Sequence, residues 1–247
     1  MKSGQLVPRG IVAGLVVILA LLAGPAVAAT SGLQEFRFRV LLDDDEIGTH
    51  RFRVSREGGQ ETVDIDAQFK VKFIGITVYS YVHANRELWR DGCLQRIESS
   101  NVDGGDKFKV DGRSVGDRFQ LSTQDGDSEL AADCVMSFAY WKRDYLGQAR
   151  LLNAQNGEFL EVDVESGGVE QLRFDAREVS AERYRLRNQE RDVDITVWYE
   201  QQSGEWLCLE SRVDGRVIRY LPEGVKSMAR IDQPLAGKVS AEVGTRR

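Results

Sequence analysis

The chain has 247 residues, of which 42% are hydrophobic and 29% are charged, and its formal net charge is −6 at pH 7. This acidic balance argues against a nucleic-acid-binding protein and against binding to anionic membranes by charge alone, because both need basic surface. The length allows one sizeable core or two small ones.

The first 28 residues have the features of a cleavable secretory signal peptide. Lys2 and Arg9 precede an apolar run over residues 11–22, and residues 26–28 (Ala-Val-Ala) are small, as signal peptidase requires. The run is about 12 residues long, whereas a membrane-spanning helix needs about 20. We therefore expect a periplasmic protein that is cleaved near Ala28, with an uncleaved N-terminal anchor as the alternative.

Most of the chain after residue 28 has the pattern of β-strands. Residues 36–42 alternate between apolar and polar positions, as in a half-buried strand. Asp-Gly and Gly-Gly pairs, such as Asp91-Gly92, mark turns about every 8–15 residues. We predict a mainly β fold, an antiparallel curved sheet or incomplete barrel, in a single domain over residues 29–225. A poorly ordered tail is expected over residues 226–247.

Two segments of this domain resemble each other, which raises the alternative of two related halves. Residues 87–104 contain a Trp-bearing strand, a hairpin and a strand that ends in Asp-Gly, and residues 197–215 repeat this order. Hairpins often look alike by chance, so the similarity alone does not establish a duplication.

The strand expected over residues 77–89 is the most informative segment. Its even-numbered side chains are mostly small and aliphatic, which predicts that they face the core. Its odd-numbered side chains are aromatic or polar and need either solvent or a lined cavity. One interpretation is a ligand cleft with aromatic walls and polar groups that orient a head group. The other is an exposed face with cross-strand aromatic pairs. The odd-numbered residues are Tyr79, Tyr81, His83, Asn85, Glu87 and Trp89.

The sequence contains no complete catalytic motif. His83 and Glu87 lie on one face of a strand but about 13 Å apart, which is too far for a direct acid–base pair. His83 with a residue from a neighbouring strand remains a candidate general acid or base. His50 has no obvious partner and is predicted at the surface, and the acidic residues 43–46 are predicted to form a solvated turn. We expect neither a metal site nor a cofactor.

One segment departs from the β pattern. Phe138, Trp141 and Tyr145 are spaced by three and four residues, which predicts a short aromatic helix over residues 137–146 that lies on the sheet. This aromatic face either packs in the core or forms a lid. Asn153 and Gln155 follow it, and in an extended chain they would point the same way and hydrogen-bond a ligand head group.

The three cysteines, Cys93, Cys134 and Cys208, are far apart and form no Cys-x-x-Cys pair, so a zinc site is not expected. In an oxidising compartment, one disulfide and one free thiol is the simplest arrangement. Three buried, reduced cysteines are the alternative. If a disulfide forms, we expect Cys93 with Cys134, because this pair would tie the aromatic helix to the sheet.

Several short motifs, taken in order, resemble an uncharacterised family of exported bacterial proteins with a domain of unknown function. The similarity extends over residues 36–221. The last third also resembles a second exported family of unknown function. This broader group is similar to the curved-sheet fold of periplasmic lipoprotein carriers, which hold acyl chains between a half-barrel and short helices. Such a resemblance implies a fold and by itself transfers no function. The motifs are Tyr79-x-Tyr81-x-His83, Glu87-x-Trp89-x-x-Gly92, Phe138-Ala139-Tyr140-Trp141, Leu151-Leu152-Asn153-x-Gln155-x-Gly157 and Trp198-Tyr199.

These observations lead to one preferred function and two alternatives. We expect a periplasmic binding or carrier module for an apolar or amphiphilic, lipid-like ligand. The alternatives are an envelope enzyme that acts on a lipid-like substrate with His83 as acid or base, and an envelope scaffold that binds a partner protein through a sheet edge. The predicted ligand-binding residues are Tyr79, Tyr81, His83, Asn85, Glu87, Trp89, Phe138, Trp141, Asn153 and Gln155.

Overall fold

The computed structural model describes residues 32–74, 76–191 and 193–231, so the signal peptide expected over residues 1–28 lies outside the described residues. The strands are β1 (Gly32–Leu42), β2 (Asp45–Glu57), β3 (Gln60–Phe73), β4 (Ile76–Arg90), β5 (Cys93–Asp103), β6 (Asp106–Val115), β7 (Arg118–Thr123), β8 (Gly126–Ala131), β9 (Arg150–Leu152), β10 (Phe159–Glu161), β11 (Asp163–Phe174), β12 (Arg177–Asn188), β13 (Val193–Glu200), β14 (Trp206–Val213), β15 (Arg216–Pro222) and β16 (Met228–Ile231).

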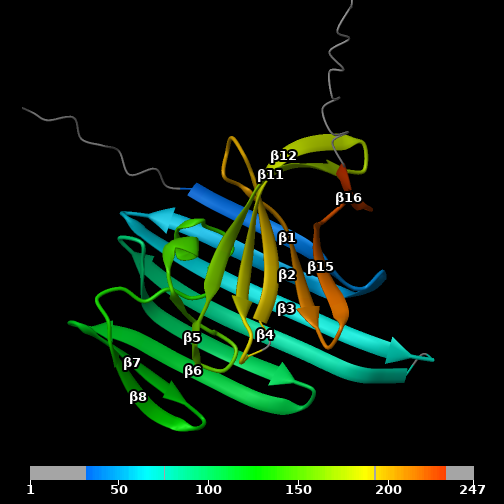
Figure 1. The fold of residues 1–247 in the computed structure, drawn as a ribbon. Coiled ribbons are helices and arrows are strands. Elements are labelled where there is room, and N and C mark those ends of the chain that lie inside the picture. Colours follow the sequence, from blue (N-terminus) through cyan, green and yellow to red (C-terminus); the bar gives the residue numbers. More distant parts are fainter. Residues whose placement is uncertain (1–31, 75, 192, 232–247) are drawn as a thin grey trace, which may run out of the picture.

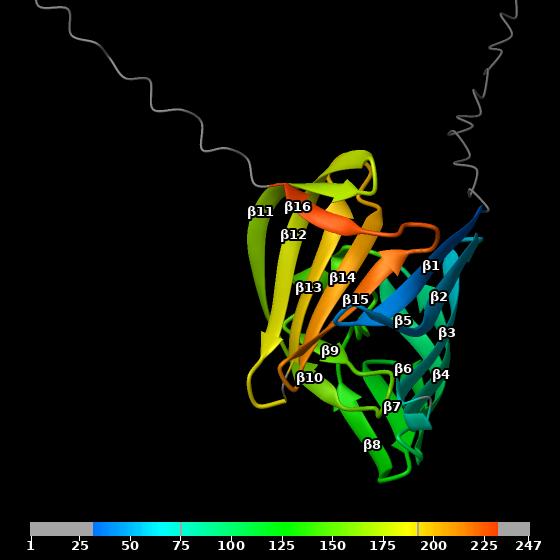
Figure 2. The same ribbon diagram turned by 90° about the vertical axis from the view of Figure 1, so that its right-hand side faces the viewer.

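Fourteen of these strands form one antiparallel sheet, in the order β16-β11-β12-β13-β14-β15-β1-β2-β3-β4-β5-β6-β7-β8. Strands β9 and β10 pair separately. The sheet is open, and it curves so strongly that β11–β15 face β1–β8 (Figure 1 and Figure 2). The predicted antiparallel curved sheet is therefore confirmed. Among the described residues, no helix has the length and apolar character to cross a membrane.

Alternation along the strands decides which face of the sheet is buried. In β1, Phe36, Phe38 and Val40 are buried, while the side chains between them are more exposed. Trp206 of β14 reaches across the fold, so that its ring centroid lies 4.3 Å from that of Phe38 and 5.0 Å from that of Phe52. Because each aromatic side chain buries a large apolar area, these contacts hold the two parts of the curved sheet together.

The predicted aromatic helix over residues 137–146 is wrong. The segment is an irregular loop in which only η1 (Asp144–Gly147), a single 3₁₀ turn, is helical. Two of its rings pack on different strands, Trp141 on Trp89 of β4 and Tyr140 on Trp206 of β14. Phe138 and Tyr145 lie against Tyr140 within the same segment. Aromatic residues have modest helix propensity, so these tertiary contacts decide the backbone path. Trp141 and Tyr145 are buried in the core.

The disulfide prediction is confirmed. Cys93 of β5 and Cys134 of the loop after β8 are bonded, with their Cα atoms 5.2 Å apart. The bridge ties an extended loop to the sheet, and the backbone N–H of Leu94 donates to the carbonyl oxygen of Val135 beside it. Cys208 is free and buried, and burial raises the pKa of its thiol.

The ordered structure extends beyond the predicted C-terminal end of the domain at residue 225. Residues 228–231, which the sequence assigns to a poorly ordered tail, instead form β16 and pair with β11.

The β4–β5 and β13–β14 hairpins each contain a bulge at the equivalent position, between Leu88 and Trp89 and between Trp198 and Tyr199. The hairpins are thus alike in structure, and a duplication stays a prediction.

Candidate functional site

Strand β4 presents its odd-numbered side chains to the interior. From residue 81 to residue 89 these side chains are at most 6% exposed, whereas Val82 on the other face is 44% exposed. The prediction that the even-numbered face packs in the core is therefore wrong. The physical reason is that Tyr81 and Trp89, at the two ends of the odd-numbered face, bury more apolar area than the small side chains of the even-numbered face.

Polar side chains of neighbouring strands meet on this buried face. In the register of the sheet, His50 of β2 is opposite Ala67 of β3, Ala67 is opposite His83 of β4, and His83 is opposite Asn101 of β5. In the next row, Asn85 of β4 is opposite Ser99 of β5. We name the polar members of both rows the polar track, which consists of His50, His83, Asn85, Ser99 and Asn101.

Each member of the polar track has one buried polar atom without a hydrogen-bond partner among the described residues. Leaving such an atom unpaired costs about 1–3 kcal/mol, and in folded proteins nearly all of them are paired. The five atoms are therefore unused hydrogen-bonding groups on one face of the sheet. The atoms are His50 Nε2, His83 Nδ1, Asn85 Oδ1, Ser99 Oγ and Asn101 Oδ1.

Burial keeps both histidines of the track neutral at pH 7. It lowers the pKa of His83 to about 4, although the Asp66 carboxylate acts in the opposite direction. It also lowers the pKa of His50 well below the ordinary value, and the nearby His83 adds to this effect. His50 Nδ1 lies 3.1 Å from the Tyr220 hydroxyl. The prediction of a surface position for His50 is therefore wrong.

At one end of the polar track, Glu87 holds neighbouring side chains in place through hydrogen bonds. Its carboxylate accepts hydrogen bonds of 2.9 Å from Asn85 Nδ2 and from Trp89 Nε1, and the Ser137 side chain also hydrogen-bonds to it. Burial raises the pKa of Glu87, and these hydrogen bonds act against that rise. Because its oxygens are already engaged, Glu87 positions the site rather than presenting a free group to a ligand.

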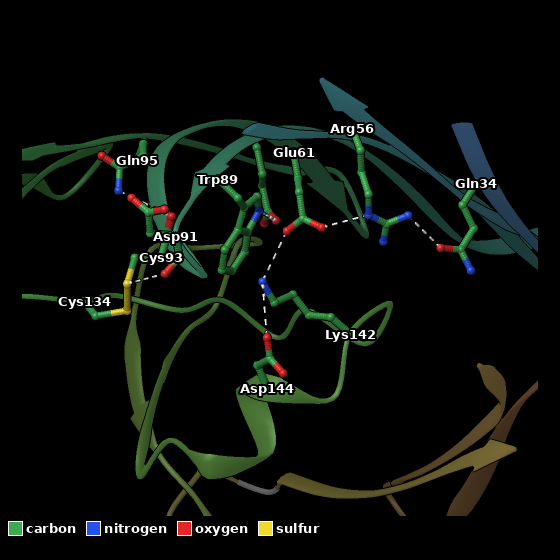
Figure 3. A network of polar contacts seen from close by, with 11 residues as sticks. Gln34, Arg56, Glu61, Trp89, Asp91, Cys93, Gln95, Cys134, Lys142 and Asp144 are labelled. Atoms are coloured by element: carbon green, nitrogen blue, oxygen red, sulfur yellow. Dashed lines mark hydrogen bonds and ion pairs between the residues drawn. A yellow bond between two sulfur atoms is a disulfide. The ribbon is translucent and has the colours of Figure 1, made fainter. Parts of the chain in front are cut away.

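A loop held by Lys142 covers this end of the site (Figure 3). The Lys142 Nζ atom lies 4.7 Å from the centroid of the Trp89 ring and 5.0 Å from that of the Trp141 ring. It also lies 3.4 Å from Glu61 Oε2 of β3. The disulfide anchors the same loop on its other side (Figure 3). Cation–π contacts, an ion pair and a covalent bond together fix the loop on the sheet.

At the other end, the polar track adjoins apolar surface. Tyr81 stacks on Phe69, with ring centroids 5.0 Å apart, and both belong to a small buried cluster with Val40 and Ala67. Ile47 packs against this cluster and also lines a hollow of about 410 Å³ beside the end of β3 that leads into the β3–β4 turn. Hydrogen-bonding and apolar surfaces therefore lie side by side in the interior.

The structure brings together only part of the predicted ligand-binding set. Tyr79 is 37% exposed, and its hydroxyl donates to Asp103. Asn153 Oδ1 accepts a hydrogen bond from the backbone N–H of Gln155, which is exposed, in the turn between β9 and β10. Phe138 is half-buried. The predicted residues that lie on the buried face of β4, or pack on it, are Tyr81, His83, Asn85, Glu87, Trp89 and Trp141.

The sequence alone did not identify three members of the track. His50 shares its face with Phe52, and this alternation could have placed it inside. Ser99 and Asn101 carry no such signal, because Ser100 between them is polar as well. In the described part of the chain, no group of three or more His, Cys, Asp or Glu side chains could hold a metal ion.

The chain is similar to a solved structure and matches a family model. The crystal structure of a β-barrel-like protein of domain of unknown function DUF1849 from Brucella abortus is similar, with a TM-score of 0.55 and 12% sequence identity. The match covers 83% of this chain and 100% of that one, and at this identity it shows the fold alone. No curated protein matches the chain. The family model described as "Domain of unknown function (DUF6134)" matches residues 38–223, so the chain belongs to the DUF6134 family.

Proposed function

We propose that the protein is a binding or carrier module for an amphiphilic ligand whose polar part is recognised by the polar track. The observation that carries the proposal is the set of five buried, unpaired polar atoms on neighbouring strands. A ligand that hydrogen-bonds to these atoms would offset the cost of burying them. Its apolar part would lie against Phe69 and Tyr81, which adjoin the track.

The chemistry of the track favours a neutral polar group on the ligand. Both imidazoles are neutral at pH 7, and the free atoms of Asn85 and Asn101 are carbonyl oxygens, which accept hydrogen bonds. A buried phosphate or carboxylate would instead need a cation or several donors. We therefore infer a head group that carries hydroxyl or amide groups, such as glycerol or a sugar.

The two alternative functions have less support. A histidine with a pKa of about 4 is a weak base at pH 7, and the His83 Nδ1 atom has no hydrogen-bond partner among the described residues. A scaffold that binds through a sheet edge would use β8 or β16, which have only six and four residues. Short edge strands are a common device against pairing with other chains.

Export to the periplasm is part of the proposal. The disulfide between Cys93 and Cys134 is typical of proteins in an oxidising compartment. The signal-peptide pattern of residues 1–28 supports the same location. N-terminal sequencing of the exported form should begin near Ala29, and a membrane-bound form that retains Met1 would contradict export with cleavage.

Native mass spectrometry of the protein purified from the bacterial envelope tests ligand binding directly. We expect a co-purified glycerolipid or glycolipid with a neutral head group. In solution, 1-monooleoylglycerol should displace the fluorescent probe 1-aminoanthracene more strongly than oleate does. The preference follows from the absence of charge on the track's own side chains at pH 7.

Variants on the two faces of the sheet separate recognition from folding. His83→Leu and Asn101→Leu should each weaken binding of 1-monooleoylglycerol about tenfold, because each removes one hydrogen bond to the ligand. The matched control is Gln68→Leu, which changes an exposed side chain of β3. Equal affinities for the wild type and all three variants would contradict recognition by the track.

A further inference from the structure

The β3–β4 hairpin continues as a two-stranded projection beyond its neighbours. The pairing of β2 with β3 ends at Phe69, and the pairing of β5 with β4 ends at Tyr81. Beyond these positions, the described residues of β3 and β4 form a strand ladder only with each other, apart from one hydrogen bond from the Gly104 N–H to the Ser80 carbonyl oxygen. Figure 1 shows the hairpin reaching past the ends of the adjacent strands. The side chains of this projection can therefore contact a surface that the rest of the sheet does not reach.

At the turn and on its β4 side, most of the exposed side chains of this projection are apolar. Nine large hydrophobic side chains are exposed in the described residues. Five of them lie in the β3–β4 turn or on β4, between residues 74 and 82. The remaining four are scattered over other strands, as is normal for a protein surface. Ile74 at the turn is 84% exposed, and Ile76 and Val78 are 69% and 61% exposed. The five are Ile74, Ile76, Val78, Tyr79 and Val82.

Two cationic side chains of β3 lie alongside these apolar residues, with Lys72 opposite Thr77 and Lys70 opposite Ser80. Lys70 and Lys72 of β3 are exposed, and neither forms an ion pair with any residue that the structure describes. Tyr79 is on the adjacent strand, between the apolar end and the body of the sheet. An apolar end, an aromatic residue and unpaired lysines are the elements with which proteins bind at the surface of an anionic bilayer.

We propose that the end of the β3–β4 hairpin inserts into the surface of a phospholipid bilayer. Ile74, Ile76 and Val78 would enter the boundary between head groups and acyl chains, and Lys70 and Lys72 would contact anionic lipid phosphates. A protein partner fits less well, because protein interfaces are enriched in aromatic residues and arginine and depleted in lysine. The acidic net charge of the chain is compatible with this proposal, because insertion of apolar side chains drives the binding and the two lysines add a local attraction.

The β3–β4 hairpin lies beside a hollow in the protein. The hollow of about 410 Å³ beside the projection is lined by Lys70 and Val71 of β3 and, from β2, by Asp45, Glu46 and Ile47. Ile47 also packs against the apolar cluster that adjoins the polar track. Insertion of the hairpin would bring this hollow to the bilayer surface, where an amphiphilic ligand resides. The membrane contact itself rests on the hairpin alone and does not depend on the proposed ligand binding.

Co-sedimentation of the mature protein with vesicles tests the contact. Vesicles of phosphatidylethanolamine and phosphatidylglycerol should bind the wild type, and the double variant Ile76→Ser/Val78→Ser should bind about tenfold more weakly because less apolar surface enters the bilayer. The matched control is Val169→Ser/Val213→Ser, which removes exposed valines elsewhere and should bind like the wild type. Lys70→Gln/Lys72→Gln should weaken binding to these vesicles more than to vesicles of phosphatidylcholine alone.

Two further measurements make the outcome decisive. A fluorophore attached through Ile76→Cys should shift its emission to shorter wavelength on addition of vesicles, because Cys208 is buried and leaves residue 76 as the accessible thiol. The Ile76→Ser/Val78→Ser variant should keep the wild-type melting temperature and, without vesicles, the wild-type affinity for 1-monooleoylglycerol. No vesicle binding by the wild type, or equal binding by the Ile76→Ser/Val78→Ser variant, would overturn the proposal. Loss of self-association in that variant without any vesicle binding would also overturn it, in favour of a protein partner.

Discussion

The carboxylate of Glu87 accepts a 2.9 Å hydrogen bond from the indole Nε1 of Trp89, two residues further along the same buried face of β4. This contact joins the polar track to the aromatic end of the core. Burial raises the pKa of Glu87, which means that the folded chain favours the protonated carboxyl more than the unfolded chain does. The stability that this group contributes is therefore full below its ordinary pKa of 4.5 and declines as the pH rises through the folded pKa.

Glu87→Gln should flatten the dependence of unfolding free energy on pH above 4.5. Glutamine keeps an acceptor for the Trp89 N–H and carries no charge. Glu87→Ala should instead destabilise the fold by about 2–4 kcal/mol, because it leaves buried donors unpaired and opens a cavity. Urea titrations of both variants between pH 4.5 and 8 would check this. The same pH slope in Glu87→Gln and wild type would show that Glu87 does not titrate as described.

The two histidines of the polar track should make the protein sensitive to acid. The folded pKa of His83 is about 4, below its ordinary value of 6.5, so proton uptake favours the unfolded chain. The contribution is full above pH 6.5, and about 3 kcal/mol is lost as the pH falls toward 4. Burial lowers the pKa of His50 in the same direction. The double variant His50→Gln/His83→Gln should reduce the loss of stability between pH 7 and pH 5, as measured by thermal unfolding, and an unchanged loss would argue against neutral imidazoles.

The disulfide should contribute strongly to stability. Cys93 and Cys134 are 41 positions apart, and closing a loop of this length is worth about 3–4 kcal/mol in the chain-entropy model. Cys93→Ser/Cys134→Ser should lower the unfolding free energy by this amount in urea titrations. Reductant should destabilise the wild type and leave the double variant unchanged. A reductant effect on the double variant would point to Cys208 instead.

Ala67 distinguishes a ligand-binding interior from a filled core, because it lies between the two histidines of the polar track. If the track binds a ligand, Ala67→Leu should fill part of the binding space. It should then weaken displacement of 1-aminoanthracene by 1-monooleoylglycerol about tenfold, with little change in melting temperature. In a close-packed core, the added methyl groups would instead cost about 1–3 kcal/mol of stability. The second result, with unchanged affinity, would contradict the proposed binding site.

Trp141 should behave as a core residue. It is 5% exposed, and its ring meets that of Trp89 edge to face, with centroids 5.7 Å apart. Trp141→Ala should therefore lower the unfolding free energy by about 3–5 kcal/mol. A much smaller loss, measured by urea denaturation, would mean that the loop acts as a lid over the sheet.

The sequence by itself determined the features that depend on local physics. Alternation over residues 36–42 and Asp-Gly turns such as Asp91-Gly92 specify strands and hairpins, because side-chain direction and turn geometry are set within a few residues. The antiparallel curved sheet followed from these features. The pairing of Cys93 with Cys134 was also predicted correctly, on the ground that it would tie the expected aromatic helix to the sheet, although that segment is a loop rather than a helix.

The tertiary structure alone decided which residues form the candidate site. Both faces of residues 77–89 could have been buried on local grounds, and the choice depends on Trp89 meeting Trp141 and Tyr81 meeting Phe69. The helical spacing of Phe138, Trp141 and Tyr145 was outweighed by tertiary contacts, such as those of Trp141 with Trp89 of β4 and of Tyr145 with Tyr199 of β13. Asn101 joined the site only because β5 pairs with β4 in this register. Burial of a polar group depends on what lies across the sheet and above it, and these neighbours are far away in the sequence.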